Sequence, residues 1–142
     1  MKILLAVDGS KQSLAAVEGL IEHVSWYRDK PQVELVTVHL PLPPIGGLGG
    51  GVSKAQVQKY YEDEGREALA GAKKRLDAAR IPYQPRILVG PVAETLVKHA
   101  RTSGCDLVCV GTRGMTAAAN ALLGSTATKV LHLSTLPVLL LK

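Results

Sequence analysis

Three glycines, two hydroxyl side chains and an arginine follow a short apolar run near the end of the chain. Leu107–Val110 is followed at once by Gly111-Thr112-Arg113-Gly114, and Gly124-Ser125 come after nine intervening residues. Glycine lets the backbone approach a ligand closely, and backbone N–H groups, hydroxyls and a cation are the partners that phosphate oxygens take. The spacing therefore predicts a phosphate site at the carboxyl end of a buried strand.

A carboxylate ends the first apolar run in the same way. Asp8 follows Ile3–Val7, which has the length of a strand. Its carboxylate could accept hydrogen bonds from ribose hydroxyls or hold a metal beside phosphates, and it could equally favour the N-terminus of the next helix. Asp8 alone leaves these roles open, and a phosphate site opposite it favours the ligand role.

The other motifs indicate no further chemistry. The Gly46–Gly51 cluster does not satisfy G-x-G-x-x-G, because Val52 occupies the last position, and the chain has no Walker A sequence. His39 has no partner indicated by the sequence, and Cys105 and Cys109 do not have metal-binding spacing. Without paired carboxylates, a nucleophile elbow or a Cys/His arrangement, we predict neither catalytic nor metal-binding residues.

The composition is typical of a globular domain with an aliphatic core. The 142 residues are enough for one domain over 1–142, and the absence of phenylalanine favours a parallel sheet buried between helices. The net charge is +5, but the basic residues are spread along the chain, so no nucleic-acid partner is expected. With no visible signal peptide or membrane span, and cysteines typical of reduced thiols, we expect a cytoplasmic protein.

Apolar runs and helical periodicities alternate along the chain. Strands are predicted at 3–7, 33–39, 83–89, 106–110 and 136–141. Helices are predicted from Ser10 to near Trp26, over Lys54–Arg80, from Gly90-Pro91 onward, and before His132. Residues 40–53, rich in proline and glycine, are expected to form a flexible loop. This order implies parallel strands with right-handed crossovers, which is a doubly wound α/β sheet.

Doubly wound sheets bind ligands outside the carboxyl ends of their strands. Asp8, His39-Leu40, Gly90 and Gly111 fall at such ends, so they can converge on one crevice. The last apolar run, 136–141, would be an edge strand if the strand order is 3-2-1-4-5. Pairing with its own copy in a twofold dimer would then cover this edge.

These segments together resemble the universal stress protein superfamily, in its ATP-binding subgroup. Ile3–Ser10 is similar to the opening strand and loop, and Gly111-x-x-Gly114 with Gly124-Ser125 matches the ATP-binding signature G-x2-G-x9-G-S/T. Gly90–Glu94 and Pro137–Leu140 are similar to further segments of the family. The resemblance covers essentially the whole chain.

The resemblance implies a Rossmann-like fold of the adenine nucleotide alpha hydrolase type, with parallel strands in the order 3-2-1-4-5, helices on both faces and ATP at the carboxyl edge. The nucleotide contacts that it implies are Ala6, Val7, Asp8, Leu40, Val110, Gly111, Arg113, Gly114, Gly124, Ser125 and Thr126. It also implies a homodimer through the last strands, with an interface of Leu136, Val138, Leu139, Leu140 and Leu141. Ala127 replaces a second hydroxyl that many ATP-binding members carry, so one phosphate or metal contact is expected to be absent.

The expected function is the binding of ATP by a stress-response dimer that hydrolyses it little or not at all, with any Mg²⁺ held mainly by phosphates and water. One alternative is an enzyme, either a slow ATPase or a nucleotidyl or phosphoryl transferase, that uses the same crevice. Another is an interaction module, independent of nucleotide, that captures a protein partner through residues 40–53. The sequence names neither the stress nor the partner.

Overall fold

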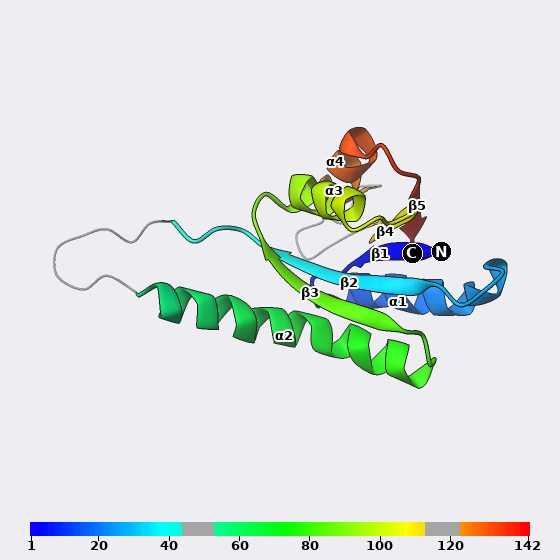
Figure 1. The fold of residues 1–142 in the computed structure, drawn as a ribbon, viewed down its shortest axis with the longest axis horizontal. Helices are drawn as coiled ribbons and strands as arrows, with labels where there is room; N and C mark the ends of the chain where they lie inside the picture. Colours follow the sequence, from blue (N-terminus) through cyan, green and yellow to red (C-terminus); the bar gives the residue numbers. More distant parts are fainter. Residues whose placement is uncertain (44–52, 113–122) are drawn as a thin grey trace.

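Five parallel strands form one sheet that lies between two pairs of helices (Figure 1). The computed structural model describes residues 1–43, 53–112 and 123–142, so most of the predicted loop 40–53 lies outside the described residues. The strands are β1 (Lys2–Ala6), β2 (Gln32–His39), β3 (Tyr83–Val89), β4 (Leu107–Gly111) and β5 (Val138–Leu141). The helices are α1 (Lys11–Glu22), the short 3-10 helix η1 (Val24–Trp26), α2 (Lys54–Ala78), α3 (Val92–Thr102) and α4 (Ser125–Leu133).

The strand order is β3-β2-β1-β4-β5, which confirms the predicted doubly wound α/β sheet. Helices α1 and α2 cover one face, and α3 and α4 cover the other (Figure 1). Successive residues of a strand point to opposite faces, so a sheet covered on both sides needs apolar residues at consecutive positions. In β1, Leu5 enters the core beneath α1 and α2, and Leu4 enters the core beneath α3 and α4. Both side chains are fully buried.

The predicted helix from Ser10 to near Trp26 is too long, because α1 ends at Glu22. Its start is as predicted, and the Ser10 hydroxyl accepts a hydrogen bond from the Ser13 N–H at 3.1 Å. At the other end the ring of His23 bonds to the Gly19 carbonyl at 2.7 Å, and η1 follows. The chain therefore tightens into a 3-10 turn where a continuous helix was expected.

Two other element ends differ from the prediction for local reasons. Helix α2 ends at Ala78, because Arg80 adopts a left-handed conformation with φ +54°. Strand β5 begins at Val138, because the Ser134 hydroxyl bonds to both the N–H and the carbonyl of Leu136. Strands β1 and β4 lie within one residue of their predicted ranges.

Strand β2 carries a carboxylate into the apolar sheet at Glu34, which is 2% exposed. One oxygen of Glu34 lies 3.0 Å from Lys2 Nζ, and the other lies 3.1 Å from Arg86 Nε and 3.3 Å from His99 Nε2. Burial alone raises the pKa of Glu34, but the hydrogen bonds from Lys2, His99 and Arg86 outweigh it and hold that pKa below its ordinary value. We call these four residues the Glu34 cluster.

Candidate functional site

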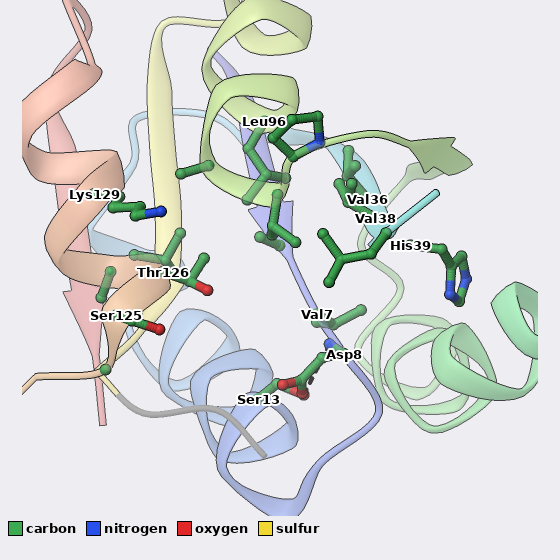
Figure 2. Close-up of a pocket in the computed structure, with 18 of the residues that line it drawn as sticks. Val7, Asp8, Ser13, Val36, Val38, His39, Leu96, Ser125, Thr126 and Lys129 are labelled. Carbon is green, nitrogen blue, oxygen red and sulfur yellow. Dashed lines mark hydrogen bonds between the residues drawn. The ribbon is translucent and has the colours of Figure 1, made fainter. Parts of the chain in front are cut away.

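A cavity of about 860 Å³ opens at the carboxyl edge of the sheet. The ends of β1, β2 and β4 line it, together with the starts of α3 and α4 and the N-terminal part of α2. Figure 2 shows that these side chains reach it from both faces of the sheet. Every predicted nucleotide contact within the described ranges lines the cavity, namely Ala6, Val7, Asp8, Leu40, Val110, Gly111, Gly124, Ser125 and Thr126. Arg113 and Gly114 lie outside the described residues.

Asp8 is fixed by the turn that joins β1 to α1. Its Oδ1 atom accepts a hydrogen bond from the Ser10 N–H at 3.0 Å, and its own N–H donates to the Ser13 hydroxyl at 3.3 Å. Gly9 has a φ of +80°, and a Cβ on it would lie 3.0 Å from the Ala68 Cα of α2. Only glycine fits this turn, which sets the Asp8 carboxylate at the edge of the cavity (Figure 2).

The segment that leaves β2 forms another wall of the cavity. Leu40 is 65% exposed at the sheet edge. The hydroxyl of Tyr61, on α2, lies 3.4 Å from the Leu40 carbonyl oxygen and 2.6 Å from the Leu42 nitrogen. The Nε2 atom of His39 is buried and has no hydrogen-bond partner among the described residues. This wall therefore combines apolar surface with polar atoms.

Backbone hydrogen bonds place the start of α4 beside the end of β4. The Thr112 N–H donates to the Leu141 carbonyl at 2.9 Å, and the Gly124 N–H donates to the Thr112 carbonyl at 2.8 Å. Gly124 is the N-cap residue and has no side chain to bond the N–H groups of the first turn. Ser125 and Thr126 add exposed hydroxyls there, so this helix end suits an anion.

Lys129 is a cavity residue that the sequence reasoning missed. It is exposed on α4, and Figure 2 shows its ammonium group directed toward the cavity. Residues four apart lie on the same side of a helix, so its spacing from Ser125 was a usable signal. Its positive charge lies on the same side of α4 as the Ser125 hydroxyl.

The aromatic wall of the cavity was also missed by the sequence reasoning. Tyr60 and Tyr61 line the cavity with Leu42, and Glu94 lines it from the first turn of α3. The hydrogen-bond partners of Tyr61 lie 19 and 21 residues away in the sequence. No local pattern could therefore have indicated what its hydroxyl contacts.

Ala127, where a hydroxyl was expected to be missing, is 3% exposed and packs into the core beneath α3 and α4. The next hydroxyl, on Thr128, bonds to the Gly124 carbonyl at 3.1 Å. Ser125 and Thr126 are therefore the residues of the first turn that present hydroxyls to the cavity.

Two further properties come from the described residues. Cys105 and Cys109 are buried free thiols, and burial raises the pKa of Cys109 to about 12. Among the helices that the structure describes, none combines the length and apolar character needed to cross a membrane.

Comparison with known proteins gives a consistent result. The sequence model of the Universal stress protein family matches residues 1–142. Universal stress protein MJ0531 of Methanocaldococcus jannaschii is 30% identical over 142 residues, which cover 99% of this chain and 81% of that protein. The structure of MJ0577 from the same organism has a TM-score of 0.78 at 23% identity, covering 99% of this chain and 94% of that chain.

Other solved structures with this fold hold adenine nucleotides. A universal stress protein of Arabidopsis thaliana with AMP bound has a TM-score of 0.71 at 15% identity, covering 100% of this chain and 91% of that one. Universal stress proteins in complex with cAMP and with dAMP match with TM-scores of 0.65 and 0.64. At these identities, 24% and 20%, the likeness shows the shared fold.

Proposed function

Because the chain belongs to the universal stress protein family, we propose that its crevice binds an adenine nucleotide, with ATP as the expected ligand. The observation that carries this proposal is the convergence of Asp8, Leu40 and Gly111 with the N-terminus of α4 on one cavity. Its volume of about 860 Å³ lies within the range of small-molecule sites. AMP, cAMP and dAMP, the ligands of the three related structures, share the base and at least one phosphate.

We place the phosphates at the start of α4. The uncapped N–H groups of the first turn, the Ser125 and Thr126 hydroxyls and the Lys129 ammonium are donors suited to phosphate oxygens. Arg113 and Gly114 are proposed to complete this end of the site, as the signature implies. The positive end of the helix and one lysine attract an anion. They do not enclose it, so this end of the site does not select a particular number of phosphates.

We place the ribose and base between β1 and β2. Asp8 offers a carboxylate to ribose hydroxyls, while Ala6 and Val7 continue the same wall. Leu40 and the apolar ends of β2 and α3 provide the surface against which a planar base would pack. Mixed apolar walls with a few fixed polar groups are typical of nucleotide sites.

We propose that the bound nucleotide is hydrolysed slowly or not at all. One oxygen of Asp8 is already bonded to the Ser10 N–H. Within the described ranges, no three histidine, cysteine, aspartate or glutamate side chains are placed to hold a metal ion. Any Mg²⁺ would therefore be held mainly by phosphate oxygens and water, with little contribution from these side chains.

We further propose that the chain is one domain that forms a homodimer through β5 and acts in a nucleotide-dependent stress response. β5 is an edge strand of the sheet, and Val138, Leu139 and Leu140 remain partly exposed on it. Leu136 lies just before β5, and Leu141, only 8% exposed, already packs within the core. Antiparallel pairing of two such edges would bury this apolar strand.

The test is a thermal melt of the whole protein with AMP or ATP, each with and without Mg²⁺, combined with calorimetric titration. Saturation at about 100 times Kd stabilises by about 2.7 kcal/mol, which raises Tm by about 10 °C for a chain of this size. A phosphate-release assay on the same sample separates binding from hydrolysis. No Tm shift and no heat with either nucleotide would overturn the proposal, and rapid turnover would favour the ATPase alternative.

A further inference from the structure

We propose that Tyr61 sets the preference of the crevice for its base by holding the backbone that leaves β2. This inference rests on the proposed nucleotide function, and it assigns a positioning role to a residue of α2. Tyr61 acts through Leu40 and Leu42, which line the same cavity.

The Tyr61 hydroxyl joins α2 to the chain just beyond the sheet. The ladder between β2 and β3 ends with the pair His39 and Val89, and Leu40 follows beyond it. The hydroxyl donates to the Leu40 carbonyl at 3.4 Å and accepts from the Leu42 N–H at 2.6 Å. One side chain therefore bonds the backbone on both sides of Pro41, beyond the last pair of the β2–β3 ladder.

The ring that carries this hydroxyl is itself held in place. Tyr61 is 8% exposed, and its ring lies 5.9 Å from that of His39 and 5.8 Å from that of Tyr60. Figure 2 shows His39 at the side of the cavity next to α2. A buried ring between two neighbours has little freedom to change rotamer, so the position of its hydroxyl is fixed.

A fixed backbone matters most for recognition of the base. Adenine presents an acceptor at N1 and a donor at N6, whereas guanine presents a donor at N1 and an acceptor at O6. A cavity wall that pairs with the hydrogen-bonding pattern of adenine leaves polar groups unpaired when guanine binds. Such discrimination requires that the wall be positioned to within about 0.5 Å. Loosening Leu40 should therefore reduce the preference for adenine more than the affinity for the phosphate.

The experiment compares Tyr61→Phe with Tyr27→Phe in the whole protein. Tyr61→Phe keeps the ring and removes both hydrogen bonds, while Tyr27, at the end of η1, does not line the cavity. Dissociation constants for AMP and GMP are measured by competition. We expect Tyr61→Phe to weaken AMP about fivefold with little change for GMP, and Tyr27→Phe to change neither.

Leu42→Pro is a second variant that keeps Tyr61 and the core intact. It removes the N–H that donates to the Tyr61 hydroxyl, so the ratio of GMP to AMP dissociation constants should fall in the same direction. An unchanged ratio in both variants, or an equal loss for AMP and GMP, overturns the positioning role. Absence of AMP binding by the unaltered protein overturns the proposed function itself, and this inference falls with it.

Discussion

The two polar regions of β2 lie five residues apart and are built in opposite ways. Glu34 is 2% exposed, and its two oxygens contact Lys2, Arg86 and His99. The end of the same strand is open, with Leu40 exposed and the Nε2 atom of His39 unpartnered among the described residues. One region has its polar groups paired within the protein, and the other lines a cavity.

This contrast separates a polar group that stabilises the fold from one that is available to a ligand. A buried carboxylate with several partners contributes to stability, because its burial is compensated by charged hydrogen bonds. Polar atoms around a cavity contribute little until something binds there. Variants of the Glu34 cluster should therefore change stability alone, and variants of the cavity should change affinity alone.

The largest expected effect comes from Glu34→Gln. Removing the charge leaves the Lys2 ammonium and the Arg86 guanidinium without their carboxylate, which should lower the free energy of unfolding by about 2 kcal/mol in urea denaturation. The affinity for AMP should stay unchanged. Glu18→Gln is the control, because the exposed pair Arg75–Glu18 should contribute less than about 0.5 kcal/mol. An equal loss in both variants would contradict the role assigned to burial.

The same carboxylate should govern part of the acid sensitivity. The folded-state pKa of Glu34 is lowered from its ordinary value of 4.5, so its contribution to stability is complete above that pH. The contribution is lost as the pH falls through the folded-state pKa. Urea unfolding from pH 6 downward should show a shallower pH dependence for Glu34→Gln than for the unaltered protein. Parallel curves would show that other groups dominate.

Lys129→Met should produce the largest loss of affinity among the described cavity residues. It removes a cation from the phosphate end and keeps the aliphatic stem, so AMP should bind about tenfold more weakly with Tm of the free protein unchanged. Lys98→Met, on the exposed side of α3, is the matched control and should change neither. A similar loss of affinity in both variants would mean that the effect comes from the net charge of the protein and not from a contact between Lys129 and the phosphate.

Ser125→Ala should have the smallest effect. The hydroxyl is one donor among several at the start of α4, and the first-turn N–H groups remain, so the affinity for AMP should fall about threefold. Calorimetric titration can resolve this difference. A loss larger than that of Lys129→Met would mean that the hydroxyl, and not the lysine, is the main side-chain partner of the phosphate.

The sequence alone was sufficient for the sheet and for the strand ends that meet at the cavity. Continuous apolar runs such as Ile3–Val7 indicate strands buried on both faces. The alternation of these strands with helices along the chain indicates that the strands are parallel. Since the carboxyl ends of parallel strands meet at one edge, Asp8, Leu40 and Gly111 could be expected to lie together. Local composition carries this information, because strand length, turn residues and periodicity are properties of neighbouring residues.

Contacts between distant residues were accessible only through the folded chain. Glu34 stands in an apolar strand, and nothing near it in the sequence indicates that Lys2, Arg86 and His99 surround it. In the same way nothing near Tyr61 in the sequence indicates that its hydroxyl bonds a segment about twenty residues away. Side-chain partners of this kind depend on how helices pack against the sheet, and packing is set by the whole chain and not by the periodicity of any one element.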